Sequence, residues 1–257
     1  MVLRFLIVTQ DFGFVIYIIY AILRVMNESS VKKSSIILNS IIFLLTAYAT
    51  TCMILGINFS GRSKEVLAFT ASNMEAFKYF TVDSNVLAGI TALIYLIIEA
   101  KGKGLSQRAC TFLHCLRLAA ASGVTLTMLV TAFFLIPQFG KHWYILYIDN
   151  NFFFHLTIPL LCVITYIFFE PGAKILTFKQ SLTGIIPMLL YAVVYTINII
   201  LHLGNGEPLK TYDWYGFLGD KLTNAFIAVP AMLLVTWGIS LGLWLGNRKF
   251  SNRPTQD

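Results

Sequence analysis

One stretch of the sequence, KYFTVDSNVLAGI, places hydroxyl and amide side chains where an apolar helix begins. Thr81, Ser84 and Asn85 are three and four residues apart, so they share one face of a helix. A threonine hydroxyl is too weakly nucleophilic at neutral pH to attack a carbonyl carbon unless a neighbouring base takes its proton. Thr81 is the candidate nucleophile, and Ser84, one turn further on, is an alternative. Either residue needs a base from elsewhere in the chain.

The stretch NNFFFHLTIP supplies a candidate base. Asn151 and His155 lie on one face of a second apolar helix, and a neutral imidazole can accept the proton of a hydroxyl that attacks an ester. The amides of Asn150 and Asn151, or free N–H groups in the first turn of a helix, are candidates to stabilise the oxyanion that forms. Together the two stretches predict a Thr81 nucleophile and a His155 base.

Each of these residues also has a structural interpretation. Serine and threonine hydroxyls hydrogen-bond to their own helix and help membrane helices pack. Asn85 is the type of residue that joins two helices, and a histidine inside an apolar helix often has only a structural partner. Spacing alone leaves these alternatives open.

The elements that must position these residues are transmembrane helices. The chain of 257 residues is 57% hydrophobic and 12% charged, and its mean hydropathy is +0.75, so it lacks the polar surface of a soluble protein. Because a lipid-exposed backbone must satisfy its own hydrogen bonds, apolar runs of roughly 20 residues are helical. We predict one all-α domain over residues 1–257, a polytopic bundle of seven helices. The runs are Phe5–Val25, Ile36–Ile57, Tyr79–Ile98, Leu113–Ile136, Asn151–Phe169, Leu182–His202 and Leu222–Leu245.

The first run is the least regular, because Thr9, Gln10 and Asp11 interrupt it. It has no Ala-x-Ala-like cleavage site and continues past the length of a signal peptide, so we interpret it as a helix. If it is not a span, the bundle has six helices.

Basic residues in the loops predict the orientation of the bundle. Of the 19 lysines and arginines, twelve, with Arg117 among them, fall on one set of alternating connections and the C-terminus, and seven fall on the other set. The richer side is expected to be cytoplasmic, with the N-terminus outside and the C-terminus inside. Topology thereby explains the formal net charge of +7, and we expect no nucleic-acid partner.

This orientation adds further polar residues to the outer half of the bundle. Asn198 and His202 close the sixth predicted helix, and Trp214 lies in the long outer connection that follows it. Polar groups at such depth tend to face the bundle interior or a wet cavity, and they are functional candidates by default. The complete set of substrate-binding or oxyanion candidates is Ser84, Asn85, Asn150, Asn151, Asn198, His202 and Trp214.

No cofactor motif accompanies these residues. The sequence has no HExxH motif, Walker loop, dinucleotide fingerprint or GxSxG nucleophile elbow, and its four histidines are dispersed. We therefore expect neither a metal nor another cofactor. Cys52, Cys110, Cys115 and Cys162 lie in or near apolar runs, which predicts free thiols rather than a disulfide framework.

Stripes of small residues predict close packing of helices. One stripe is Ala119–Gly123 in the fourth run, and the other consists of Gly238, Gly242 and Gly246 in the last. Small side chains at such spacing let membrane helices approach closely.

Four stretches, KYFTVDSNVLAGI, NNFFFHLTIPLLCVITYIFFEP, KQSLTGIIPMLLYAVVYTI and DWYGFLGD, together resemble the androgen-induced-gene family of multipass membrane proteins and its bacterial relatives. The resemblance covers roughly residues 77–220. Animal members are threonine hydrolases that cleave fatty acid esters of hydroxy fatty acids with an intramembrane Thr and His. The resemblance implies that Thr81 of KYFT and His155 of HLTIP hold these roles. The chain departs from the family in its additional N-terminal helix and in Asp83, where bacterial relatives carry an uncharged polar residue.

We therefore expect a membrane-embedded lipid ester hydrolase that acts on a fatty acid ester within the bilayer. The alternative is a non-catalytic transporter or lipid-binding membrane protein. Inverted repeats or paired broken helices would favour a transporter, whereas the helix prolines Pro159, Pro187 and Pro230 are isolated.

Overall fold

The part of the chain described by the computed structural model is mostly helical, with short connecting turns and no strand in that part. Six of its helices are long and apolar enough to cross a membrane. The protein is thus a polytopic all-α bundle, as predicted. The described residues are 28–57, 73–102, 105–170, 175–203, 212–216 and 221–251.

The six spans include several that change helix type along their length. The single-type spans are α2 (Glu28–Ile54), α4 (Phe80–Lys101) and α11 (Ala225–Ser251). The third span joins α5 (Gln107–Val130), the π-helix η2 (Thr131–Leu135), α6 (Ile136–Phe139) and η3 (Gly140–Tyr147). The fourth joins α7 (Asn150–Phe152), the π-helix η4 (Phe153–Thr157), α8 (Ile158–Ile164) and the π-helix η5 (Thr165–Phe169). The fifth joins the 3-10 helix η6 (Phe178–Ile185) to α10 (Ile186–Leu201). Two short helices, η1 (Met74–Lys78) and η8 (Leu222–Asn224), precede α4 and α11.

These spans correspond to the second to seventh predicted runs, with ends that differ by several residues. The predicted first helix, Phe5–Val25, lies outside the described residues. Polar ends extend the helices beyond their apolar runs, because a helix continues into the membrane interface until a cap stops it. Gly102, with φ +60°, ends α4 in the left-handed conformation, and the Ser106 side chain accepts from the Ala109 N–H at the start of α5.

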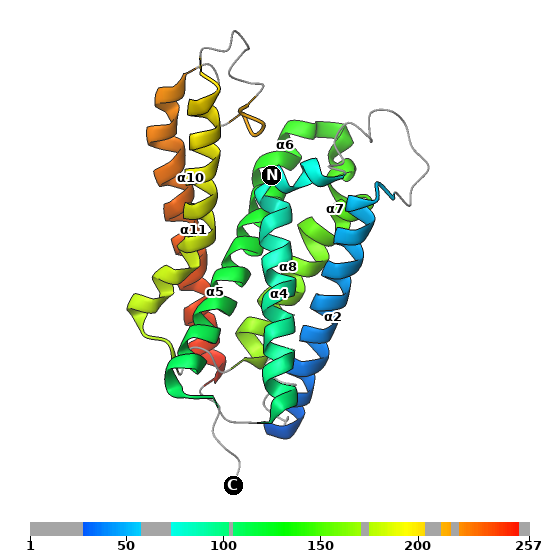
Figure 1. Cartoon of the computed structure of the whole chain (residues 1–257), viewed down its shortest axis with the longest axis vertical. Coiled ribbons are helices and arrows are strands. Elements are labelled where there is room, and N and C mark those ends of the chain that lie inside the picture. The colour runs from blue at the N-terminus through cyan, green and yellow to red at the C-terminus, as the bar shows by residue number, and fades with distance from the viewer. Residues whose placement is uncertain are drawn as a thin grey trace, which may run out of the picture.

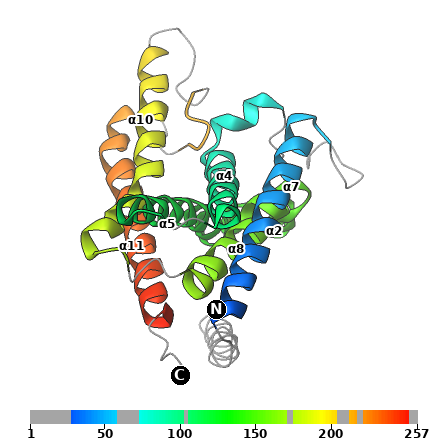
Figure 2. The ribbon, with the colours of Figure 1, turned by 60° about the horizontal axis from the view of Figure 1, so that its bottom comes forward.

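The helix α5 lies between two groups of helices. Figure 1 shows α5 between α10 and α11 on one side and α4 and α2 on the other, and Figure 2 shows α5 running from α10 and α11 toward α4. In Figure 1, α10 and the first half of α11 stand apart from α4 and α2. The central position of α5 explains why most of its residues from Leu113 to Thr127 are buried.

The packing prediction for Ala119–Gly123 is confirmed, because all five residues are buried in the bundle. A methyl group at Gly123 would lie 3.1 Å from Ser84 Cβ of α4. A second close approach joins α5, η6 and α11, where a methyl group at Gly184 would overlap the hydroxyls of Ser122 and Ser240. Small residues therefore bring both neighbours close to α5.

The glycine stripe of the last helix behaves differently. A methyl group at Gly246 would touch Ile167, but one at Gly238 or Gly242 would meet no atom of the described chain within 4 Å. At these two glycines the predicted packing is not found against the described residues. The reason is that α11 turns this part of its surface away from the other described helices, a rotation that spacing does not determine.

Large apolar side chains cover the outside of the bundle. Leu190, Val194 and Leu201 of α10 and Phe226 and Ile227 of α11 are each at least 63% exposed. Such a surface is typical of helices that face lipid, and it agrees with a multipass membrane protein.

Candidate functional site

The polar face of α4 contacts the helix that carries His155. Asn85 is fully buried, and its side-chain amide donates to the Phe154 carbonyl at 3.0 Å and to the Thr81 carbonyl at 2.7 Å. One amide therefore connects the backbone of Thr81 to the residue before His155. The structure thus brings together the two stretches that the sequence singled out. Asn85 joins two helices, which is the structural role that the sequence analysis gave as its alternative interpretation.

His155 is held in one tautomer by its backbone partner. Its Nδ1 lies 2.7 Å from the Leu146 carbonyl oxygen, which can only accept, so Nδ1 carries the proton and Nε2 carries the lone pair. The residue is 8% exposed. A buried imidazole in this tautomer has the form that a general base requires.

A local change in the helix accompanies His155. The residue lies in the π-helix η4 and is followed by Pro159, which has no N–H to donate to the carbonyl four residues earlier, that of His155 itself. Wider π turns relieve such a mismatch and occur often at functional sites. The sequence signal for this feature is the His-x-x-x-Pro spacing.

Thr81 is half-buried beside a tyrosine that sequence reasoning did not include in the site. The Tyr215 hydroxyl accepts from the Phe80 N–H at 2.8 Å and also hydrogen-bonds with Thr81. Burial raises the pKa of Tyr215 to about 12, although these hydrogen bonds partly offset the rise. At neutral pH a protonated phenol therefore lies next to the candidate nucleophile.

The remaining inner candidates are buried around this contact. Ser84 Oγ lies 3.2 Å from Thr127 Oγ1 of α5 and donates to the Thr81 carbonyl at 3.1 Å. Asn150 and Asn151 are buried at the start of α7, and Asn150 Oδ1 has no hydrogen-bond partner among the described residues. No hydrogen bond in this described region joins the Thr81 side chain to His155, so their direct pairing stays a prediction.

The outer candidates lie on α10 and the segment after it. Trp214 Nε1 donates to the Tyr191 hydroxyl at 2.9 Å. His202 bonds through Nδ1 to the Asn198 carbonyl at 2.7 Å, and its ring stacks on Tyr212 with centroids 4.1 Å apart. Asn198 and Trp214, together with Ser84, line a groove of about 470 Å³ between α4 and α10, but Thr81 and His155 do not. The predicted set thus forms an inner and an outer group, and Ser84 belongs to both.

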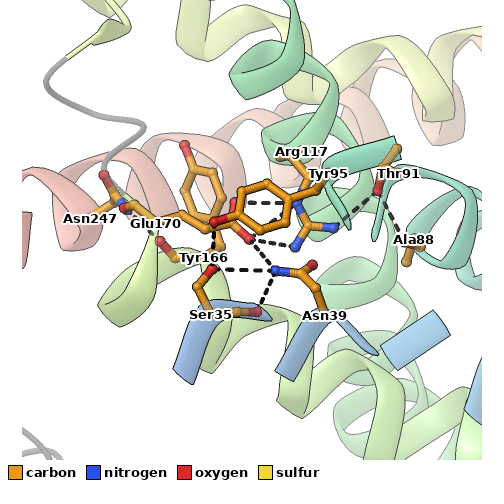
Figure 3. Close-up of polar contacts among 9 residues, drawn as sticks. All are labelled: Ser35, Asn39, Ala88, Thr91, Tyr95, Arg117, Tyr166, Glu170 and Asn247. Atoms are coloured by element: carbon orange, nitrogen blue, oxygen red, sulfur yellow. Dashed lines mark hydrogen bonds and ion pairs between the residues drawn. The ribbon is translucent and has the colours of Figure 1, made fainter. Parts of the chain in front are cut away.

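A second polar cluster, absent from the sequence-based prediction, lies at the other end of these helices (Figure 3). Arg117 of α5 and Glu170, directly after η5, form a buried ion pair with NH2 2.6 Å from Oε1. Arg117 Nε adds contacts of 3.1 and 3.2 Å to the two carboxylate oxygens, and NH1 donates to Thr91 Oγ1 at 3.2 Å. The count of basic residues in the loops included Arg117. This assignment to a loop was wrong, because the Arg117 side chain is only 3% exposed and lies inside the bundle.

The cluster connects five helical segments. Asn39 of α2 donates to Glu170 Oε1 at 3.3 Å and to the Ser35 carbonyl, and Ser35 donates to the Tyr95 hydroxyl of α4 at 3.0 Å. Asn247 of α11 donates to the Tyr166 and Glu170 carbonyls. The signal in the sequence was Asn39 and Asn247 inside or next to apolar runs, since a buried amide needs partners.

Two further expectations concern metals and thiols. Within the described ranges, no group of three or more His, Cys, Asp or Glu side chains could hold a metal ion. All four cysteines are free, with Cys52 and Cys162 buried and Cys110 and Cys115 half-buried. The predicted free thiols are confirmed.

The fold and its polar interior define this protein as a multipass α-helical membrane protein. No family model matches the chain, and no curated protein and no solved structure matches it either. The function must therefore be inferred from the residues themselves.

Proposed function

We propose that the protein is a membrane-embedded lipid ester hydrolase related to the androgen-induced-gene family, with Thr81 as nucleophile and His155 as base. The observation that carries the proposal is the contact through Asn85, which holds the candidate nucleophile's helix against that of a histidine in the proton-accepting tautomer. Fatty acid esters of hydroxy fatty acids, or similar long-chain esters, are the proposed substrates.

The proposed reaction has two steps and balances without a cofactor. In the first, Thr81 Oγ1 attacks the ester carbonyl, its proton passes to His155 Nε2, and the bond to the alcohol breaks as that proton is returned to the leaving oxygen. In the second, His155 activates a water that cleaves the acyl-threonine ester. The protonated Tyr215 phenol beside Thr81 and the amides of Asn150 and Asn151 are candidate donors to the oxyanion.

Labelling with a fluorophosphonate probe tests the class of the protein. The purified protein should be phosphonylated at Thr81, because the probe reacts with activated hydroxyl nucleophiles, and mass spectrometry of the peptide identifies the residue. Labelling at Ser84 would keep the hydrolase class but move the nucleophile by one turn. Absence of site-specific labelling in folded protein would favour the non-catalytic alternative, for which the open groove between α4 and α10 is the supporting feature.

We also propose that the N-terminus lies outside and the C-terminus lies in the cytoplasm, in the cell membrane if the protein is bacterial. The excess of basic residues on one set of connections supports this orientation, and it remains after Arg117 is removed from the count: eleven against seven. A single cysteine introduced at Lys101, in a variant without the native thiols, should react only after sealed right-side-out vesicles are opened. Reaction in intact vesicles would reverse the topology.

A further inference from the structure

The groove between α4 and α10 has the size and lining of a binding site. Its volume of about 470 Å³ falls in the range of small-molecule pockets, which are mainly apolar with a few polar groups. Its walls include Leu87 on α4 and Leu190 and Val194 on α10. These residues belong to membrane-spanning helices, so the opening of the groove is at the level of the lipid tails.

The length of the groove matches one leaflet of the bilayer. Its lining runs along α10 from Pro187 to Asn198, and eleven residues of α-helix rise about 16 Å. The hydrocarbon core of a bilayer is about 30 Å thick, so this distance is close to half of it. An acyl chain from a lipid of that leaflet therefore fits along the groove.

A lysine and two other polar side chains gather at one end of the groove. Lys78, Asn198 and Trp214 form the rim, where the Tyr191 hydroxyl donates to the Lys78 carbonyl at 2.6 Å and accepts from Trp214 Nε1. These hydrogen bonds join the end of η1, just before α4, to α10 and fix the width of the rim. The Lys78 ammonium lies 5.4 Å from the centroid of the Tyr79 ring, and the side chain is exposed.

The charges on the wall determine how a lipid would be oriented. Lys78 attracts an anionic group at the rim. Asp83 of α4, five residues after Lys78, also lines the groove, and its carboxyl group does not attract an anion deeper inside. A lipid with a carboxylate therefore binds best with its charge at the rim and its chain directed toward Leu87.

We propose that this groove binds the acyl chain of a carboxylate-bearing lipid, with the carboxylate at Lys78. The inference rests on the proposed function, because the bound chain is that of the ester substrate or its fatty acid product. Ser84, which lines the groove on the same helix face as Thr81, connects the acyl site to the candidate nucleophile. A chain in the groove thereby lies within one helical turn of Thr81.

The test uses a palmitic acid that carries a photoreactive diazirine on its chain, with the full-length protein in phosphatidylcholine nanodiscs. Labelled peptides are expected from α4 and α10, and micromolar unlabelled palmitate should displace the label, although hexanoate should not. Val194→Trp, which fills the groove, should reduce labelling on the order of tenfold or more, because each methylene excluded loses its burial. The matched control is Val193→Trp on the same helix, since Val193 is exposed but does not line the groove.

Three results would overturn the proposal. These are equal labelling of the Val194→Trp and Val193→Trp proteins, no displacement by palmitate, and equal affinity for palmitate and its methyl ester in the wild type. Lys78→Gln should remove the preference for the acid. The probe has no ester bond, so its labelling of the groove does not depend on hydrolysis. Failure of this proposal can therefore be distinguished from failure of the proposed hydrolase function.

Discussion

Thr81→Ala and His155→Ala should each lower the turnover of a long-chain ester by roughly three orders of magnitude or more, if the two residues act as one catalytic unit. The double variant should be hardly less active than either single variant, because a nucleophile without its base and a base without its nucleophile are equally ineffective. Turnover is measured with a long-chain ester in detergent micelles or nanodiscs.

The loss of activity should not come from unfolding. Ser84 and Asn85 donate to the Thr81 backbone carbonyl, which alanine retains, so Thr81→Ala should change the free energy of unfolding by less than about 1 kcal/mol. His142→Ala is the control for the histidine, because His142 is exposed on η3. A folded, monodisperse Thr81→Ala protein with wild-type turnover would transfer the nucleophile's role to Ser84 or favour the non-catalytic alternative.

Glu170→Ala should be among the most destabilising single substitutions in the chain, with a loss of about 3–5 kcal/mol. It leaves the Arg117 guanidinium buried without its anion and removes one acceptor of the Asn39 amide. The protein should show a large drop in the midpoint of thermal or denaturant unfolding in detergent. Helices α2 and α5 should lose their connection first, because the carboxylate is their common partner.

The matched control is Glu99→Ala. Glu99 pairs with Lys32 at 2.7 Å, but the two side chains are 24% and 62% exposed, so the expected loss is at most about 1 kcal/mol. Replacing both members of the buried pair, as in Arg117→Met with Glu170→Met, should cost less than Glu170→Ala alone, because no unpaired charge remains. A Glu170→Ala protein as stable as the Glu99→Ala protein would contradict a structural role for the ion pair.

The sequence by itself determined the class of the fold and the six described spans. Apolar runs of sufficient length must be helical in lipid, because each backbone group has to find its partner within the same segment. This requirement is local, so it can be predicted without knowledge of neighbouring helices. Local chemistry also singled out Thr81 and His155, since a helix face follows from spacing.

Only the tertiary structure decided which faces meet. Arg117 and Glu170 are 53 residues apart. In the sequence, a basic residue near the end of an apolar run looks the same whether it lies in a loop or forms a buried ion pair. Gly123 and Gly238 both belong to small-residue stripes, yet only Gly123 packs against a neighbour in the described chain. The rotation of each helix about its axis depends on packing and hydrogen bonding with all its neighbours. The sequence of a single apolar run contains no repeating pattern that records these contacts. The groove between α4 and α10 and the Asn85 contact to Phe154 arise from that rotation.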